Sequence, residues 1–390
     1  MEQNMESTLD RMPIIDIDTH YTEPADLWTA RAPAKLKGRM PRVERNRRGQ
    51  DMWVVEENVR LGPAGVSVIR KDGTKIHGDF SLKTLDEMTE TATDPQARLA
   101  AMDELGVHAH IVYPNALGFS GAFLMRVEDP ELRDLCVAMY NDAVAELQAA
   151  GEGRIYPQAV LPFWDIERAV GELHRCREIL GLTGFTMTDS PEEWRLPSLH
   201  DPHWDPLWSA AQALELPVNF HIGSGKITNP CWQGYELPRQ LAVMSVSVIM
   251  NNLNCLTNLI FSGLLDRFPM LNFVSVESGI GWVPFLLEAC EYQMDQNMGP
   301  GRCGLKLRPR EYFERQIYTS FWFEKENLAP AIEFLGEDHV MFETDVPHPT
   351  CLYPNMREHL HEAIGEMDER VQRKLLYETA SRLYKIPLPD

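Results

Sequence analysis

The run Ile14-Ile15-Asp16-Ile17-Asp18-Thr19-His20 is a short apolar segment whose last residues carry side chains able to bind a metal ion. Three later runs share this design: Pro217-Val218-Asn219-Phe220-His221, Phe273-Val274-Ser275-Val276-Glu277 and Val340-Met341-Phe342-Glu343-Thr344-Asp345. Short apolar runs of this kind, bounded by loops, are typical of buried strands. The sequence therefore predicts metal-capable groups at the carboxyl ends of four separate strands.

Strand-like runs alternate with helical patterns along the rest of the chain, as in βαβ units with a parallel sheet. Asp94-Pro95, for example, is expected to open a helix that ends at Gly106. We count eight strand-like runs, at residues 14–20, 108–113, 155–163, 184–188, 218–221, 271–277, 316–321 and 340–345. This pattern predicts an α/β fold, a (β/α)8 TIM barrel, as a single domain over residues 1–390. The irregular stretch after strand 1, about residues 24–95, is expected to be an insertion over the barrel mouth or edge.

A parallel barrel gathers the carboxyl ends of its strands around one pocket, so the four metal-capable ends should converge. Because alternate strand residues face the same side, Asp16, Asp18 and His20 are predicted to face inward together. The same alternation predicts three inward pairs: Asn219 with His221, Ser275 with Glu277, and Glu343 with Asp345. Several buried carboxylates are costly unless a cation balances them. Mixed histidine and carboxylate ligands predict one divalent metal ion, Zn²⁺ first, with Mn²⁺ or Fe²⁺ as alternatives.

Composition excludes several other classes of function. The chain has 58 acidic and 37 basic residues, a net charge of −21, and its only dense basic stretch, Arg42 to Arg48, is expected to be a solvated loop. We therefore predict no nucleic-acid partner. The seven cysteines form no close pair, which favours a reducing, cytoplasmic location. Residues 1–10 lack the apolar segment of a signal peptide, and the apolar stretches look too short for a membrane span, so no membrane partner is expected.

Several motifs resemble the amidohydrolase superfamily, in particular the group that includes aminocarboxymuconate semialdehyde decarboxylase and the 2-hydroxybenzoate-type decarboxylases. The motifs are Asp18-Thr19-His20 with Glu23-Pro24, Arg98 to Val107, His221-Ile222-Gly223, Asp266-Arg267-Phe268-Pro269 and Thr344-Asp345-Val346-Pro347-His348. The resemblance implies Asp18, His20, His221 and Asp345 as metal ligands, with Asp345 also handling a proton. It further implies a homo-oligomer, either a dimer or a tetramer.

Two positions depart from the pattern of that group. Asp18 stands where relatives use His or Glu, and its shorter side chain would move the metal or require a bridging water. Glu277 stands where strand six of relatives commonly ends in a proton-transferring His. Three roles stay open for Glu277: an acid or base, a further metal ligand, or a structural partner of a neighbouring cation.

The leading functional prediction is metal-dependent hydrolysis of a small organic molecule. A bound cation lowers the pKa of its water, Asp345 would act as general base, and Glu277 or His348 could protonate the leaving group. The alternative is non-oxidative decarboxylation of an aromatic or unsaturated carboxylic acid, in which an acid protonates the ring carbon. A barrel that has lost its chemistry and serves in binding or assembly is the third class, and intact ligands argue against it.

Overall fold

Eight short parallel strands form the centre of the computed structural model, which describes residues 7–225 and 231–389. They are β1 (Ile15–Tyr21), β5 (Ala109–Pro114), β6 (Ile155–Pro157), β7 (Phe185–Thr186), β8 (Val218–His221), β9 (Phe273–Val276), β10 (Ile317–Phe321) and β11 (Val340–Phe342). The eight strands predicted from the sequence are thereby confirmed. The third ends at Pro157 instead of Phe163, because prolines at 157 and 162 have no N–H to donate to a ladder.

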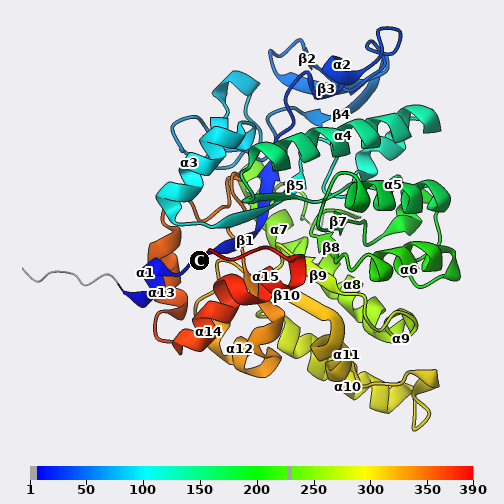
Figure 1. Ribbon diagram of the computed structural model, residues 1–390, viewed down its shortest axis with the longest axis vertical. Helices are drawn as coiled ribbons and strands as arrows, with labels where there is room; N and C mark the ends of the chain where they lie inside the picture. The colour runs from blue at the N-terminus through cyan, green and yellow to red at the C-terminus, as the bar shows by residue number, and fades with distance from the viewer. Residues whose placement is uncertain (1–6, 226–230, 390) are drawn as a thin grey trace, which may run out of the picture.

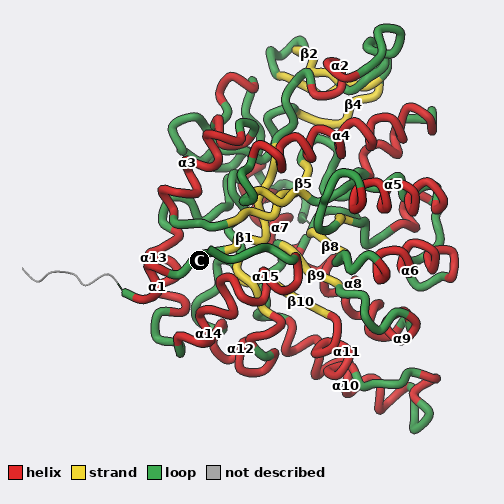
Figure 2. Tube along the Cα trace, viewed as in Figure 1, coloured by secondary structure: helices red, strands yellow, loops and turns green. Residues whose placement is uncertain are grey.

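Two sheets together close into a barrel. One has the order β1-β5-β6 and the other β11-β10-β9-β8-β7. Parallel bridges join Ala159 to Phe185 at one seam and Thr19 to Val346 at the other. Figure 2 shows these strands in the middle of the molecule with helices around them. The predicted (β/α)8 barrel is confirmed.

The helices form the outer layer, and they follow the strands in the predicted order (Figure 1). Asp94 caps the first large helix, since its Oδ1 accepts a hydrogen bond from the amide of Ala97 at 2.7 Å, and Gly106 ends it with φ 68°. The helices of the outer layer are α3 (Pro95–Leu105), α4 (Pro130–Ala150), α5 (Ile166–Glu178), α6 (Asp205–Ala213), α7 (Leu237–Ser247), α8 (Ile249–Phe261), α9 (Leu264–Arg267), α10 (Val283–Asn297), α11 (Pro309–Gln316), α12 (Leu328–Leu335), α13 (Met356–Ile364) and α14 (Glu369–Arg373).

The insertion after β1 contains a small antiparallel sheet of β2 (Arg42–Arg45), β3 (Asp51–Val55) and β4 (Val59–Pro63). The prediction that residues 42–48 form a loop is wrong for 42–45, because these residues pair with β3 as an edge strand. Farther along, the insertion returns to the barrel. The amide of Ile69 donates to the carbonyl of Pro347 at 2.9 Å, and the Asn115 side-chain amide donates to the carbonyl of Val66 at 2.9 Å. Residues 66–69 of the insertion therefore lie beside the loops that follow β5 and β11.

The C-terminal helix α15 (Thr379–Tyr384) closes the opposite end of the barrel, where it crosses the strands in Figure 1. Its buried Tyr384 enters the barrel, and the hydroxyl donates to Asn219 Oδ1 at 2.6 Å. Ala380 and Leu383 pack with Ile15 of β1 in the same interior cluster. Among the described residues, α15 therefore covers the end of the barrel opposite the metal-capable side chains. The cysteines in the described ranges form no disulfide bond.

Candidate metal centre

An irregularity in β1 decides which of its polar side chains face the barrel interior. Asp16 pairs with His110 of β5 and Thr19 with Val112, so β1 holds one residue more than β5 between these pairs. Such a bulge re-aims the side chains that follow it. Ile17, which belongs to the interior cluster, and Asp18 are therefore both turned inward, and His20 follows them.

The prediction that Asp16 faces inward with Asp18 and His20 is consequently wrong. Asp16 accepts a hydrogen bond from the amide of Thr344 at 2.9 Å and lies 3.9 Å from Nε2 of His110. The other ring nitrogen of His110 is 3.4 Å from the guanidinium of Arg98, on the outer helix α3. Asp16 thus belongs to a buried polar group between barrel and helix.

Strand β9 also departs from simple alternation. Val274 and Val276 lie in the interior cluster, whereas the hydroxyl of Ser275 accepts a hydrogen bond at 2.9 Å from Asn252 of the outer helix α8. The predicted inward pair of Ser275 with Glu277 is therefore wrong for Ser275. Glu277 nevertheless enters the pocket, because the strand ends at Val276 and Glu277 adopts a left-handed backbone with φ 57°.

The inward pairs on β8 and after β11 agree with the prediction. Asn219 bonds to Tyr384 inside the barrel, and His221 extends above it toward the mouth. Glu343 and Asp345 both approach the same centre, the latter with φ 65°.

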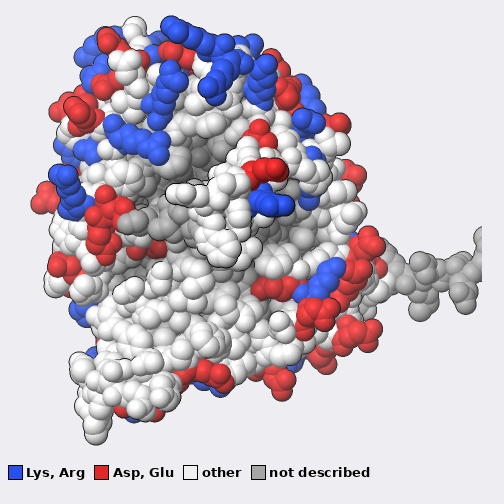
Figure 3. Space-filling view, turned by 180° about the vertical axis from the view of Figure 1, so that it is seen from behind, with Lys and Arg blue, Asp and Glu red and all other residues white. Residues whose placement is uncertain are grey.

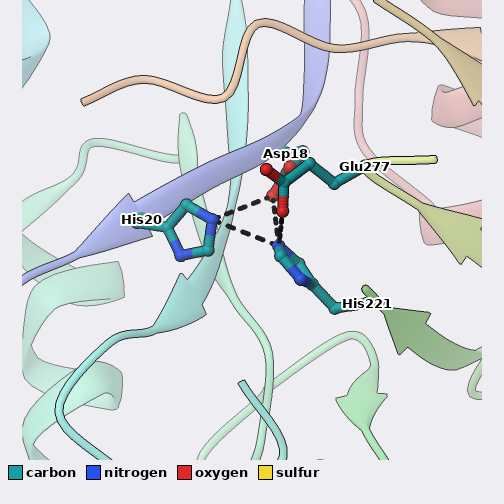
Figure 4. Close-up of side chains that lie close together, drawn as sticks. All are labelled: Asp18, His20, His221 and Glu277. Atoms are coloured by element: carbon teal, nitrogen blue, oxygen red, sulfur yellow. Dashed lines mark hydrogen bonds and ion pairs between the residues drawn. The ribbon is translucent and has the colours of Figure 1, made fainter. Parts of the chain in front are cut away.

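Four side chains from β1, from β8 and from the residue after β9 converge at the mouth, as Figure 4 shows: Asp18, His20, His221 and Glu277. The Nε2 atoms of His20 and His221 are 3.1 Å apart. Asp18 Oδ1 lies 3.5 Å from Nε2 of His20 and 3.3 Å from Nε2 of His221. Glu277 Oε2 lies 3.4 Å from Nε2 of His221. Asp345 completes the predicted ligand set, with Oδ1 3.6 Å from Nε2 of His20.

This spacing fits one divalent cation. Atoms that each bind the same tetrahedral ion at about 2.1 Å lie roughly 3.4 Å from one another. Both carboxylate oxygens of Asp18 are buried without a hydrogen-bond partner among the described residues. Burying carboxylate oxygens without a hydrogen-bond partner costs free energy unless a cation binds them. The donor set is thus chemically suited to a metal ion.

The imidazoles of His20 and His221 are oriented so that each can bind a metal ion through Nε2. Nδ1 of His20 lies 3.4 Å from the carbonyl of Pro114, and Nδ1 of His221 lies 2.7 Å from the carbonyl of Ile222. Each ring can therefore place its proton on Nδ1 and keep the lone pair of Nε2 for a ligand bond. Burial, followed by the nearby imidazoles of His348 and His221, lowers the pKa of His20 well below its usual range, which favours the neutral form.

The pKa values of the carboxyl groups shift in the opposite direction. Burial raises the pKa of Glu277 and of Glu343 well above the ordinary value, and repulsion from Asp18 and Asp345 adds to both shifts. Burial also raises the pKa of Asp345. Without a cation, these shifts favour the protonated, uncharged form of the carboxyl groups.

His348, the remaining predicted catalytic residue, is held against the same centre. Its Nδ1 lies 2.6 Å from Asp345 Oδ1, and its ring stacks on His20 with centroids 3.7 Å apart. The hydroxyl of Thr350 donates to Asp345 Oδ2 at 2.6 Å. All of the predicted site residues are therefore brought together.

Sequence reasoning missed several residues that shape the site. Phe119 packs on both ligand-type imidazoles, with ring centroids 4.9 Å from His20 and 4.2 Å from His221. Glu23 fixes the start of the loop that carries Phe119, since its carboxylate accepts hydrogen bonds from the amides of Asn115 and Ala116. The Glu23-Pro24 motif was a usable signal for this role, whereas nothing in the sequence marks Phe119.

Histidine and carboxylate side chains that meet at the ends of the barrel strands place this chain in the class of barrel proteins with a candidate metal site. Within that class, the family model described as amidohydrolase matches residues 15–386. The chain therefore belongs to the amidohydrolase family, and the predicted resemblance to the aminocarboxymuconate semialdehyde decarboxylase group is confirmed.

Two relatives show how far the similarity extends. A gamma-resorcylate decarboxylase of Rhizobium sp. (strain MTP-10005) is 26% identical over 267 residues, which cover 64% of this chain and 76% of the relative. A 2-amino-3-carboxymuconate-6-semialdehyde decarboxylase of Dictyostelium discoideum is 25% identical over 304 residues, which cover 75% and 77% of the two chains.

Solved structures support the same fold. An amidohydrolase from Mycobacterium avium subsp. paratuberculosis K-10 superposes with a TM-score of 0.74 at 21% identity, covering 96% of this chain and 99% of that one. A dihydroxybenzoic acid decarboxylase from Polaromonas sp. JS666, with bound manganese and 2-nitroresorcinol, gives a TM-score of 0.64 at 19% identity and covers 97% and 98%.

Replacing His221 should remove the metal. We expect His221→Ala to lose most of its bound divalent ion, because the variant lacks a ligand and leaves the neighbouring carboxylates unbalanced. Metal content per chain, measured by elemental analysis after metal-replete purification, checks this. The matched control is His174→Ala, since His174 lies on the surface of α5 and contacts only Glu178 at 3.1 Å among the ion pairs described. Equal metal content in the two variants would contradict the assignment.

Metal binding should strengthen as the pH rises. Burial raises the pKa of Asp345, one of the predicted ligands, so a cation that binds this carboxylate competes with a proton. We expect titration calorimetry of chelator-treated protein to show proton release and a tighter affinity at pH 8 than at pH 6. Asp345→Asn removes this titration and should flatten the dependence. An affinity independent of pH would show that the centre is already deprotonated.

Proposed function

We propose that this chain is a metal-dependent decarboxylase of an aromatic or unsaturated carboxylic acid. The observation that carries the proposal is a buried metal-type centre that opens directly into a small apolar pocket. The relatives named above are decarboxylases, which favours the alternative of the two predicted reactions over hydrolysis. The manganese in the Polaromonas structure supports Mn²⁺ alongside the Zn²⁺ predicted first.

The pocket suits a single ring. Its volume is about 180 Å³, and an apolar cavity of roughly 150 Å³ is enough to hold benzene. Phe119, Ile222, Val248 and Trp322 line its walls, and the described lining residues include no Lys or Arg. An aromatic acid would therefore find its ring in apolar surroundings and its carboxylate at the centre.

The insertion after β1 supplies one wall of this pocket through Ser67 and Phe80. The two residues belong to one loop, because the amide of Ser67 donates to the carbonyl of Phe80 at 2.5 Å and Val66 bridges to Ser81. The same loop is tied to the segment that carries His348, since Lys75 donates to the carbonyl of Cys351. We propose that the insertion helps to select the substrate.

In this proposal, Asp18, His20, His221 and Asp345 would hold the metal. A divalent ion bound there would supply positive charge for the carboxylate of the substrate. His348 and Thr350 hold Asp345 in place through its two oxygens. Phe119 and Trp322 would keep the ring oriented and exclude water.

Glu277 is the proposed proton donor. It forms part of the pocket wall, burial raises its pKa, and no described Lys or Arg pairs with it. The protonated carboxyl would transfer its proton to the ring carbon that bears the carboxylate. The bond from that carbon to the carboxylate then breaks and releases CO₂, and Glu277 recovers a proton from solvent. The purely structural role of Glu277 has no support in this arrangement.

The reaction itself can be tested by product analysis. We expect a screen of hydroxybenzoates with metal-loaded protein to release stoichiometric CO₂, with one solvent hydrogen gained at the ring carbon in D₂O. Esters, lactones and amides serve as the comparison set. Incorporation of ¹⁸O from labelled water into product, without CO₂, would instead establish hydrolysis.

Glu277→Gln should separate the two functional roles of this residue. If Glu277 is the proton donor, the substitution should lower turnover on the order of 10²-fold or more and leave the metal content unchanged. If Glu277 is a metal ligand, the substitution should lower metal content and activity in parallel. Glu178→Gln, an exposed carboxylate on α5, is the control. Full turnover in Glu277→Gln would reject the proton-donor role.

A further inference from the structure

The carboxylate of Glu324 joins two loops that border the pocket. Glu324 follows β10, and its Oε1 accepts hydrogen bonds from the amide of Ile280 at 2.6 Å and from the amide of Gly281 at 3.0 Å, both in the loop after β9. Its Oε2 accepts a hydrogen bond from the amide of Trp322 at 3.0 Å. Hydrogen bonds to a carboxylate are stronger than those between neutral groups. One side chain thus holds three main-chain amides.

No cation competes for this carboxylate in the described ranges. No Lys or Arg forms a salt bridge with Glu324 there, and the adjacent Lys325 pairs with Glu362 of α13 instead. Figure 3 shows the molecule from the side opposite to Figure 1, where a broad area below the centre has neither Lys nor Arg. The three amides are therefore the partners that fix the Glu324 side chain, and the side chain in turn fixes them.

The loop after β9 depends on such a contact, because it begins in a strained conformation. Glu277 has a left-handed backbone with φ 57°, and Gly279 follows with φ 65°. A left-handed backbone at a residue other than glycine costs free energy and persists only where the surrounding structure holds it. The loop passes so close to Glu324 that a Cβ at Gly279 would lie 2.6 Å from its Oε1. The hydrogen bonds to residues 280 and 281 therefore help to keep the Glu277 side chain in the pocket.

Trp322 is held from two sides as well. Its amide donates to Glu324, and its carbonyl lies 2.8 Å from Nε2 of His359 on α13. Trp322 and Glu277 both line the pocket, whereas Glu324 is not among the described lining residues. Glu324 thus connects the proposed proton donor with the proposed wall for the ring, and it does so from outside the pocket.

We propose that Glu324 is a positioning residue that keeps the Glu277 carboxyl and the Trp322 ring in the relative position that the reaction needs. The inference rests on the proposed function, because protonation of a ring carbon is the step that requires this position. A general acid must lie within hydrogen-bond reach of the atom that it protonates. Misplacement by about 1 Å can cost on the order of 10²-fold in rate. Trp322 decides where the ring lies and Glu277 where the proton is delivered, so Glu324 acts on both.

Two substitutions should separate the two sides of this contact. In Glu324→Gln one oxygen remains, and we expect it to stay with the amides of Ile280 and Gly281, because that orientation keeps two of the three hydrogen bonds. The side-chain NH₂ then faces the amide of Trp322, donor against donor. Glu324→Gln should therefore raise KM for a hydroxybenzoate and leave kcat near the unmodified value. Glu324→Leu loses all three hydrogen bonds and should also lower kcat, by up to about 10²-fold.

Steady-state kinetics with metal-loaded protein measure this difference between KM and kcat. The matched control is Glu326→Gln, at an exposed carboxylate two residues farther along, which should keep both constants. The metal content should stay unchanged in every variant, because Glu324 belongs to neither group of metal-capable side chains. Unchanged KM and kcat in Glu324→Leu would overturn the positioning role. A loss of metal that matches the loss of activity would overturn it too, since the effect would then come from the centre.

Hydrogen exchange tests the contact without any reaction. The amides of residues 280, 281 and 322 should exchange faster in Glu324→Leu, and only that of residue 322 in Glu324→Gln, while those of α5 stay unchanged. Equal exchange in the unmodified protein and in Glu324→Leu would overturn the proposal. If the unmodified protein releases no CO₂ from any acid, the proposed function fails, whereas the exchange result still decides whether Glu324 holds both loops.

Discussion

Two main-chain hydrogen bonds close the barrel and thereby create the centre. The amide of His20 donates to the carbonyl of Val346 at 2.8 Å, and the amide of Asp345 donates to the carbonyl of Asp18 at 2.9 Å. They join the first strand to the segment after the last one. Three of the four predicted metal ligands lie on these bonded residues. Their relative position therefore depends on barrel closure and not on the conformation of flexible side chains.

The centre concentrates negative charge, and the surrounding protein is arranged to tolerate it. Asp16, outside the barrel, bonds to Thr344, and burial raises its pKa to about 8. Arg98, also buried, donates to Thr19 Oγ1 at 3.1 Å and to the carbonyl of His20. These contacts fix the backbone of β1 from behind. Inside the barrel, no described Lys or Arg pairs with Asp18, Glu277 or Asp345, which leaves a metal cation as the natural counter-charge.

The pocket is formed by segments that lie far apart in the sequence. The barrel supplies the reactive groups, the insertion supplies Ser67 and Phe80, and α7 supplies Met244. A rigid barrel with variable walls is a common way for one fold to serve different substrates. Under the proposed function, the strand ends would supply the chemistry and the walls would select the substrate.

The sequence by itself determined the order of strands and helices, the barrel, and the position of His221 and Asp345 at strand ends, because local periodicity and caps carry that information. Only the tertiary structure decided that Asp16 faces outward, since the bulge in β1 arises from pairing with β5. It also decided that Glu277 enters the pocket although Ser275 does not, through a left-handed backbone that local sequence does not favour. Phe119 and Phe80 depend on contacts between segments far apart in the chain, and alternation within one strand contains no information about such contacts.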